Sequence, residues 1–557
     1  MPGCGGGDKS SSASTEAPPS RAEAARFLTQ ASFGPTEATV DRVVALGYRG
    51  WLAEQATFTS TDHVTWWSGR HAADTAVDPT ASNTSDVFNA IWRGALSAED
   101  QLRQRLAYAL SQIFVISMRD DGVNFRPLGA IGYYQTLANH AFGNYRDLLQ
   151  AVALHPMMGI YLSHLHNRKE DTVTGRVPDE NFAREVMQLF SIGLVELNID
   201  GSPRLGKDGQ PQDTYGSADI AGLARVFTGW SWYCSTQSAE CFDWGSQNGV
   251  KLPDAPTRAM VAYPAFHSTA EKRFLGTTIA AQANADPQAS LTVALDRLFA
   301  HPNVGPFIGR QLIQRLVSSN PSPAYVARVA AAFANNGLGV RGDLKAVVLA
   351  VLLDPEARAG GADLRGGKVK ELVLRVSAAL RALGASSDSG NWRIGSTDDP
   401  AFSIGQTPLN ASSVFNYYRP GYVPPGTGAA GLGLNVPEMQ ITDESSVAGY
   451  ANQMRDMLSQ GWGSTPTGAT RRDIQFDLTA LRGVAGNRAD LLAWVESRLL
   501  AGRLPAALAT LIGDAVDSVA VPAVTSSNAD AVAAALDNRS RIAIYLTLVS
   551  PEFIVQH

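Results

Sequence analysis

One acidic, one basic and two amide side chains share a face of the helix predicted for residues 179–193, DENFAREVMQLFSIG. Asn181, Arg184, Glu185 and Gln188 follow the i, i+3, i+4, i+7 spacing that forms a single stripe. Much of the remaining circumference is apolar, so we expect the stripe to be partly buried. A shielded carboxylate beside a guanidinium is a setting in which acid–base groups are tuned. The alternative is a structural ion-pair network that locks helices together.

Hydrolysis of a glycosidic bond would need a second carboxyl group near that stripe. We expect Glu185 to be the proton donor, with Asp219 or Asp179 as its counterpart. Asp219 belongs to the segment YGSADIAGLARVFTGW, which also contains Arg225. The two lie about 240° apart around a helix, so each must find its partner on another element.

Cleavage of a uronate by β-elimination is the second chemistry that these residues allow. Asn181 and Arg184 would neutralise the uronate carboxylate, and His155 or Tyr215 would act as the base. This interpretation rests on an analogy with helical-toroid lyases at the level of the fold.

Further contacts to a sugar substrate are expected from aromatic and basic side chains, since aromatic faces offer a platform for sugar rings. Clustered tryptophans are equally typical of a core. The candidate binding residues beyond the elimination pair are Gln188, Arg225, Trp230, Trp232, His267 and Lys272. A metal-dependent hydrolase would use His155, His164, His267 and Glu185, but no ligand spacing supports it. The sequence predicts no metal and no other cofactor.

Composition excludes several classes of protein. The chain has 557 residues, 45% of them hydrophobic, which argues against a mainly disordered chain. It carries 46 basic and 52 acidic residues, without the basic surplus of a nucleic-acid-binding protein. We find no apolar run approaching the ~20 residues of a membrane-spanning helix.

The three cysteines bear on the compartment. Cys4, in MPGCGGG, precedes a tract rich in Ser, Thr, Ala and Pro, and is typical of the mature start of a bacterial lipoprotein. A cloning remnant followed by a flexible tail is the alternative. In an exported protein, Cys234 and Cys241 can form a disulfide while Cys4 carries lipid. The sequence therefore predicts a periplasmic or outer-membrane lipoprotein that meets the membrane only through a lipid anchor.

The elements that must position these residues are predicted to be mainly α-helical. Apolar residues recur at three- and four-residue spacing in segments such as 102–116, 305–317, 368–383 and 529–549. We expect a flexible tether over 1–20 and a main helical domain over 21–360 with a loop-rich insertion at about 231–280. A C-terminal helical region over 361–557, with a long loop at 386–437, would pack on the first. Irregular insertions with short strands complete a large, possibly toroid-like multi-helical body.

Several long motifs in one order resemble the bacterial family known as domain of unknown function 1800. The matching segments are AFGNYRDLLQAVALHPMMGIYL, ENFAREVMQLFSIGLVELNIDGSP, TYGSADIAGLARVFTGW, FIGRQLIQRLVSSNPSPAYVARVAAAF, SVFNYYRPGYVPPG and PEMQITDESS. The resemblance implies a mostly helical exported protein, often encoded beside a sulfatase-like partner family, domain of unknown function 1501. Some relatives have Glu and His at the positions of Gln188 and Phe190, which shifts the catalytic role toward Glu185.

Together these observations predict an exported enzyme that degrades a polysaccharide, as a glycoside hydrolase or a lyase. Its cleft would be lined by the 179–193 helix. The alternative is a non-catalytic surface lipoprotein that binds a glycan or docks the sulfatase-like partner, with no role for nucleic acid.

Overall fold

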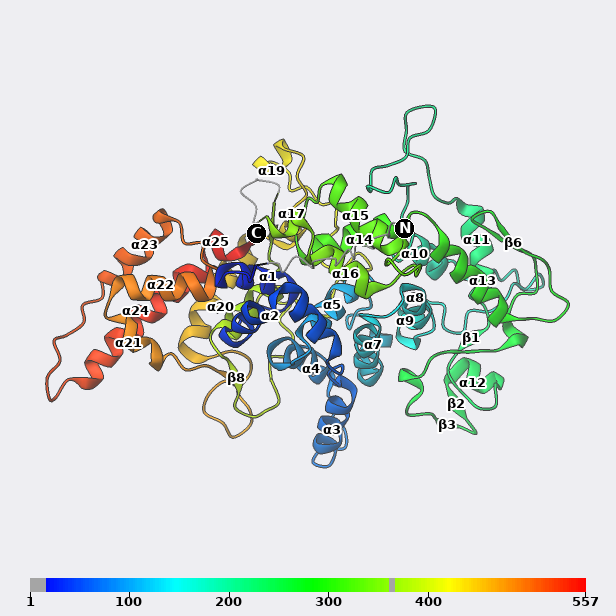
Figure 1. The fold of residues 1–557 in the computed structure, drawn as a ribbon. Coiled ribbons are helices and arrows are strands. Elements are labelled where there is room, and N and C mark those ends of the chain that lie inside the picture. The colour runs from blue at the N-terminus through cyan, green and yellow to red at the C-terminus, as the bar shows by residue number, and fades with distance from the viewer. Residues whose placement is uncertain (1–16, 360–365) are drawn as a thin grey trace, which may run out of the picture.

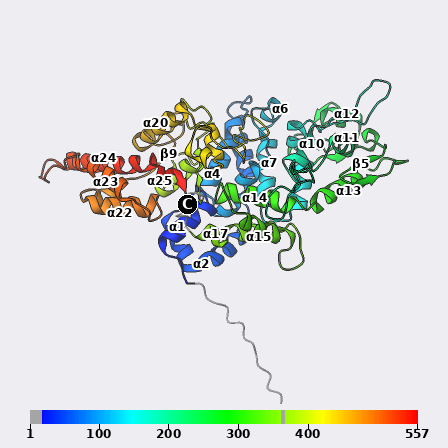
Figure 2. The same ribbon diagram turned by 90° about the horizontal axis from the view of Figure 1, so that it is seen from above.

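The computed structural model describes residues 17–359 and 366–557 and is mainly α-helical, as predicted (Figure 1). The helices form three groups along an elongated body, and neither view shows a closed ring (Figures 1 and 2). The helical groups follow one another along an axis, so neither view shows the toroid-like arrangement that the sequence left possible. Among the described residues, no helix is both long and apolar enough to span a membrane.

The first group of helices occupies the centre of the body. A capping box between Ser20 and Glu23 starts the first helix, satisfying backbone N–H groups that the helix itself leaves free. The group comprises α1 (Arg21–Ala31), α2 (Glu37–Thr57), α3 (His63–Thr75), α4 (Thr84–Ser97), α5 (Gln101–Ser111), α6 (Asp121–Asn124) and α7 (Pro127–His140).

Helix α5 ends at Ser111, short of the 102–116 segment predicted from its apolar pattern. The following residues bond to other parts of the chain instead. The Tyr133 hydroxyl donates to the Phe114 carbonyl (2.8 Å), and the Met118 N–H donates to the Leu409 carbonyl (2.8 Å). Tertiary contacts thus replace the last turn of the helix that local periodicity favours.

The second group carries the irregular insertion and most of the candidate site residues. Its helices are α8 (Tyr145–Ala153), α9 (Pro156–Tyr161), α10 (Asn181–Gln188), α11 (Ser217–Val226), α12 (Ala239–Trp244) and α13 (Pro287–Ala300). Its strands pair antiparallel as β1 (Trp230–Ser231) with β4 (Val261–Ala262), β2 (Ser246–Gln247) with β3 (Val250–Lys251), and β5 (Lys272–Phe274) with β6 (Thr277–Ile279). The 3-10 turns η1 (Ala255–Thr257) and η2 (Pro264–Phe266) lie between them.

The chain then returns to the centre before building the third group. The returning helices are α14 (Val304–Leu316), α15 (Pro323–Ala334), α16 (Leu344–Leu352) and α17 (Pro355–Arg358). The next elements are β7 (Lys368–Val369), α18 (Leu372–Ala382), β8 (Ser386–Ser387), α19 (Gly428–Gly431) and η3 (Pro437–Ile441). The last are α20 (Glu444–Gln460), β9 (Ile474–Gln475), η4 (Thr479–Leu481), α21 (Arg482–Ala485), α22 (Arg488–Leu499), α23 (Ala506–Asp517), α24 (Ala529–Leu548), α25 (Pro551–Ile554) and β10 (Val555–Gln556).

The C-terminal strand β10 pairs antiparallel with β7, placing Gln556 opposite Lys368. The helix predicted over 368–383 therefore begins only at Leu372, since the preceding residues extend to meet the end of the chain. Because the pairing strand lies nearly two hundred residues away in the sequence, nothing near residues 368–371 indicates it. The helical pattern of these four residues therefore gave a wrong prediction.

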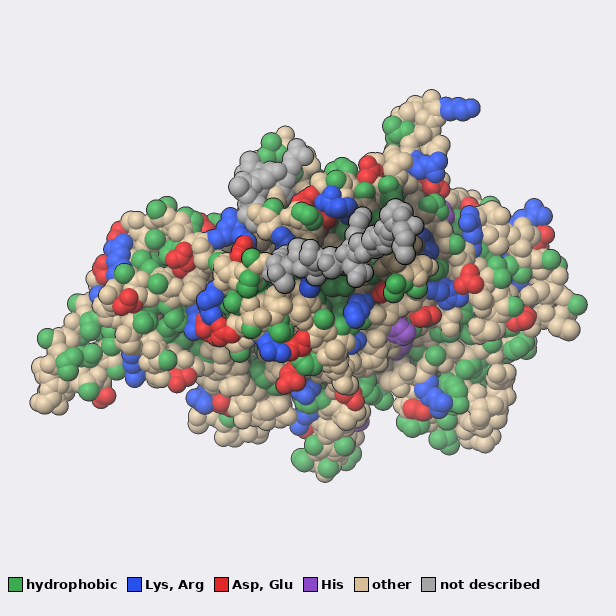
Figure 3. Space-filling model, viewed as in Figure 1, with side chains coloured by type: hydrophobic (Ala, Val, Ile, Leu, Met, Phe, Trp, Pro, Cys, Tyr) green, Lys and Arg blue, Asp and Glu red, His purple; other side chains and the backbone are tan. Residues whose placement is uncertain are grey.

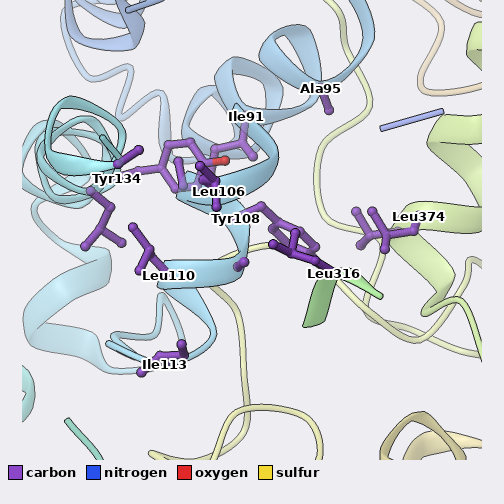
Figure 4. Close-up of a cluster of buried hydrophobic side chains, with 14 of the residues drawn as sticks. Ile91, Ala95, Leu106, Tyr108, Leu110, Ile113, Tyr134, Leu316 and Leu374 are labelled. Atoms are coloured by element: carbon purple, nitrogen blue, oxygen red, sulfur yellow. The ribbon is translucent and has the colours of Figure 1, made fainter. Parts of the chain in front are cut away.

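One continuous hydrophobic core extends through the molecule. Figure 4 shows part of it, where Tyr108 and Leu110 of α5 lie among Tyr134 of α7, Leu316 of α14 and Leu374 of α18. On the face drawn in Figure 3, basic and acidic side chains are interspersed over the surface. The elements that carry the candidate site are thus packed on this continuous core.

Candidate functional site

Helix α10 carries the predicted stripe, but it is shorter than expected, spanning Asn181–Gln188. Asp179 precedes the N-cap residue Glu180, and its carboxylate accepts from the Asn181 N–H (2.8 Å). The predicted N-cap was therefore one residue early. Gly193 adopts a φ of 73° at the end of the following turn, where an added Cβ would lie 2.8 Å from the Phe307 ring. Only glycine fits that position.

Glu185 is the buried member of the stripe, with 7% of its surface exposed. Its Oε2 atom is buried and accepts no hydrogen bond within the described part of the chain. Burial raises the pKa of the Glu185 carboxyl, and the neighbouring Arg184 opposes this only in part. The charge of Glu185 in turn helps to raise the pKa values of Tyr161 and Tyr215. These three side chains therefore form one electrostatically coupled group.

The rest of the stripe lies on the more accessible side of α10. The Tyr215 hydroxyl donates to Gln188 Oε1 (3.4 Å), which joins the start of the α11 segment to the end of α10. Arg184 is 45% exposed and pairs with Glu180 (3.5 Å), leaving further guanidinium donors available. The structure thus brings Tyr215, Gln188 and Glu185 together, with Arg184 beside them.

A broad groove begins where α10 starts, and we call it the arginine groove. It encloses about 750 Å³ and is lined by Arg126, Gly159, Ile160, Ser163, Leu165, His166, Asn167, Arg168, Arg176, Val177, Pro178, Asp179 and Trp232. Three arginines and the carboxylate of Asp179 line the groove, and two of these arginines also pair with carboxylates outside the lining, Arg168 with Asp243 (2.6 Å) and Arg176 with Asp171 (3.9 Å). The Asn181 amide donates to Ser163 Oγ (3.4 Å) and connects this groove to the stripe.

Each arginine of the groove is fixed by a contact that leaves other donors free. Arg126 donates to the Gly122 carbonyl (2.7 Å) and lies over the Trp232 ring. Arg168 pairs with Asp243 (2.6 Å), while Arg176 donates to the Lys169 carbonyl (3.0 Å). Arg126 comes from a part of the sequence separate from Arg168 and Arg176, and sequence analysis did not identify the three as a site.

Asp219 does not face Glu185, contrary to its predicted role as the second carboxylate. Its Oδ2 accepts from the Gly216 N–H (2.8 Å) at the start of α11, and its Oδ1 accepts from the Leu275 N–H (2.7 Å). The side chain therefore fastens the beginning of α11 to the turn between β5 and β6. A carboxylate held by two backbone donors is a structural group.

His155, the other predicted base, is likewise placed where it serves the fold, with 3% of its surface exposed. It is the N-cap of α9, where its Nδ1 accepts from the Met157 N–H (3.2 Å). Its ring packs edge-on against Tyr133, and burial lowers the pKa of His155 to about 3. A neutral ring inside the core cannot reach a polysaccharide.

The other two histidines of the metal alternative are also held inside the protein. His164 stacks on Phe182 with ring centroids 3.8 Å apart, and burial lowers its pKa to about 4. His267 lies between the Thr228 carbonyl (2.8 Å) and the Ser290 hydroxyl (3.1 Å), and burial lowers its pKa to about 4. Residues 17–359 and 366–557 contain no group of three or more His, Cys, Asp or Glu side chains arranged to hold a metal ion.

Four predicted substrate contacts are turned into the fold. Lys272 is fully buried and donates to the Ser268 carbonyl (2.8 Å), while Arg225 donates to the Glu271 carbonyl (2.7 Å). Trp230 is buried in the core, and Trp232, although it lines the groove, is 5% exposed. Long and aromatic side chains serve a buried core as well as a substrate site, so residue type alone does not distinguish the two roles.

Among the cysteines, a disulfide joins Cys234 to Cys241 and fastens the segment around α12. Phe242 and Tyr263 pack around it in a small satellite cluster. Cys4, the predicted lipidation site, lies outside the described residues.

A buried polar cluster around Glu371, at the start of α18, was not foreseen from the sequence. Its Oε2 accepts from the Tyr108 hydroxyl (3.0 Å), Gln112 Nε2 (2.6 Å), Gln406 Nε2 (2.7 Å) and the Tyr418 hydroxyl (2.6 Å). Residues more than two hundred positions apart meet here, so the spacing of neighbouring residues does not predict the cluster.

The comparisons with known proteins identify a family but no individual related protein. A family model described as a protein of unknown function (DUF1800) matches residues 26–555, nearly the whole chain. No curated protein matches the chain, and no solved structure does. The match confirms the resemblance drawn from the motifs and covers every residue of the stripe and of the arginine groove.

Proposed function

The chain belongs to the DUF1800 family, and on that premise we propose that it is an exported enzyme that cleaves an acidic polysaccharide by β-elimination. The observation that carries this proposal is the arginine groove, which the Asn181–Ser163 hydrogen bond joins to the helix that bears Glu185. Arg126, Arg168 and Arg176 line this groove of about 750 Å³. Ligand pockets of roughly 300–1,000 Å³ are typical of proteins.

The arginine donors of the groove favour a substrate with carboxylate or sulfate groups. The guanidinium presents several donors in a rigid fork that matches such anions. Because the donors come from three arginines rather than one, successive acidic sugars of a chain can be held along the groove.

Elimination is favoured over hydrolysis because both carboxylates considered as partners of Glu185 are already engaged. Asp219 is engaged by two backbone N–H groups, and Asp179 accepts from Asn181 N–H and from Ser163 Oγ (3.1 Å). Hydrolysis with two carboxyl groups would need one of them free.

In the proposed reaction, Arg184 and Asn181 neutralise the uronate carboxylate, and Glu185 removes the proton from C5. The C5–H electrons form the C4=C5 double bond while the C4–O bond breaks. The Tyr215 hydroxyl gives its proton to the departing oxygen, and exchange with water restores both groups. The raised pKa values suit these roles, because Glu185 becomes a stronger base and Tyr215 stays protonated.

The test is product release from a panel of uronate-containing polysaccharides, followed by the ultraviolet absorbance of unsaturated uronates and by mass. We expect unsaturated products with the wild type and at least a ~100-fold lower rate for Glu185→Gln and for Tyr215→Phe. Glu99→Gln is the matched control, since Glu99 is exposed. Saturated products would overturn the elimination mechanism, and an active Glu185→Gln variant would remove Glu185 from the reaction.

The hydrogen bonds that hold Asp219 and His155 in the fold also support a second candidate function. Because Asp219 and His155 serve the fold, a non-catalytic lipoprotein that binds an acidic glycan, or docks the sulfatase-like partner, is the alternative. Glycan binding without any product would favour it. Co-purification of the partner without glycan binding would favour docking.

The proposed location is the periplasm or the outer membrane. The Cys234–Cys241 disulfide supports an oxidising compartment, where such bonds persist. Labelling of the cells with a radioactive fatty acid tests the lipid anchor. We expect incorporation into the wild type and none into Cys4→Ser.

A further inference from the structure

A second cavity lies on the other side of α10 and differs in character from the arginine groove. It encloses about 370 Å³ between the end of α10, the segment 193–201, α14 and the segment 414–421. Its walls are mainly apolar, formed by Ile113, Leu189, Leu194, Val195, Leu197, Pro306, Phe307, Val414, Phe415 and Pro420. Leu194 is 57% exposed at the mouth, whereas Ile113 is buried at the base.

The base of this cavity is polar and incompletely paired. Gln112 and Arg315 line it and are 5% and 4% exposed. Within the described residues, Gln112 Oε1, Gln311 Nε2 and Arg315 Nε are buried without a hydrogen-bond partner. A buried donor without an acceptor is destabilising, so a bound group that accepts from Gln311 Nε2 and Arg315 Nε is favoured, whereas Gln112 Oε1 is itself an acceptor.

Arg310 adds an uncompensated charge to the wall. In the part of the chain that the structure describes, its side chain forms no hydrogen bond and no ion pair, and burial lowers its pKa. No acidic side chain lines the cavity. The guanidinium therefore faces an apolar space with its donors free for an anion.

The cluster behind the cavity does not neutralise this charge. Glu371 and Glu438 lie there with Lys368, Arg105 and Arg315, which leaves one more cation than anion. Burial also raises the pKa of Glu438, which favours its neutral form. An incoming anion thus meets a positive field at the base as well as at Arg310.

We propose that this cavity binds an anionic amphiphile, a fatty-acid-like molecule whose apolar chain packs between Leu194, Phe307 and Phe415. Its carboxylate accepts from Arg310 and from Gln311 Nε2 at the deeper end. The site is separate from the arginine groove and does not depend on the polysaccharide reaction. Because Gln188 and Leu189 form part of its wall, a bound chain would also stiffen the end of α10.

Titration calorimetry with the full chain tests this proposal, using decanoate below its critical micelle concentration. Decanol and decyltrimethylammonium share the apolar chain but lack the anion. We expect decanoate to bind at least roughly tenfold more tightly than decanol, with no measurable binding of the cation. Decyl phosphate distinguishes a carboxylate site from one built for a phosphate-headed lipid.

Variants at the charged wall sharpen the result. Arg310→Gln should reduce decanoate affinity to that of decanol, and Arg310→Lys should restore part of it. Arg455→Gln, at an exposed arginine of α20, is the matched control. Equal binding of decanoate and decanol, or an unchanged affinity in Arg310→Gln with its thermal stability intact, would overturn the proposal, as would no binding of decanoate to the wild type.

Discussion

Glu185 and Glu371 are both buried glutamates, yet their surroundings move their pKa values in opposite directions. Glu185, on α10, has one carboxylate oxygen without a donor, and burial raises the pKa. Glu371, at the start of α18, is more deeply buried, but four donors reach a single oxygen. Those donors and the Lys368 charge lower the pKa of Glu371 despite its burial.

The difference shows that burial alone does not set the protonation of a carboxyl group. Hydrogen bonds to the ionised form stabilise the charge, and their absence leaves the desolvation cost unopposed. Glu371 is therefore held ionised as a structural centre for α5, α18 and the 406–418 segment. Glu185 is the glutamate that is free to exchange a proton.

The strongest challenge to this comparison is to remove each carboxylate in turn. Glu371→Ala should lower the free energy of unfolding by about 3–5 kcal/mol, because it leaves four buried donors without their acceptor and removes a negative charge near Lys368 and Arg105. Glu185→Gln should change that free energy by no more than about 1 kcal/mol. Denaturant unfolding monitored by circular dichroism measures both.

A stable Glu371→Ala protein would show that the cluster does not depend on this charge. Conversely, a severely destabilised Glu185→Gln protein would make Glu185 a structural group as well. The contrast between the two glutamates would then no longer support a catalytic role for Glu185.

The pH dependence of stability should carry opposite signs for the two residues. Both start from an ordinary pKa of 4.5. The stabilisation from Glu371 is present above that value and is lost as the pH falls through its lowered pKa in the folded protein. The contribution of Glu185 is favourable at acid pH and is lost as the pH rises from 4.5 to its raised pKa.

Unfolding free energies measured between about pH 3 and pH 7 separate these effects. Relative to the wild type, Glu371→Gln should flatten the loss of stability in acid. Glu185→Gln should instead remove a decline on the side above pH 4.5. The same slope in both variants would contradict the assigned pKa directions.

An effect smaller than that of Glu371→Ala is expected at Asp219, one of the carboxylates predicted to act with Glu185. Asp219→Ala removes the acceptor of the Gly216 and Leu275 N–H groups and should cost about 1–2 kcal/mol. Turnover measured well below the melting temperature should stay close to wild type. A complete loss of turnover with unchanged stability would return Asp219 to the catalytic group.

The predicted and observed sites agree in one helix and diverge around it. The spacing of Asn181, Arg184, Glu185 and Gln188 identified the stripe, since a helix fixes which of its own residues share a face. The same reasoning could not orient Asp219, which turned out to bond to a backbone N–H in the β5–β6 turn. It also offered no way to connect Arg126 with Arg168 across the chain.

By itself, the sequence determined the mainly helical class, several helices with strong apolar periodicity and the polar face of α10, because periodicity and caps act within a few residues. Its motifs also identified the family. Only the tertiary structure decided that His155 and Lys272 are buried, that three arginines form a groove, and that Glu185 lacks the donors that Glu371 has. Those properties depend on contacts between distant segments, and a side chain's solvation and pKa follow from those contacts rather than from its neighbours in the chain.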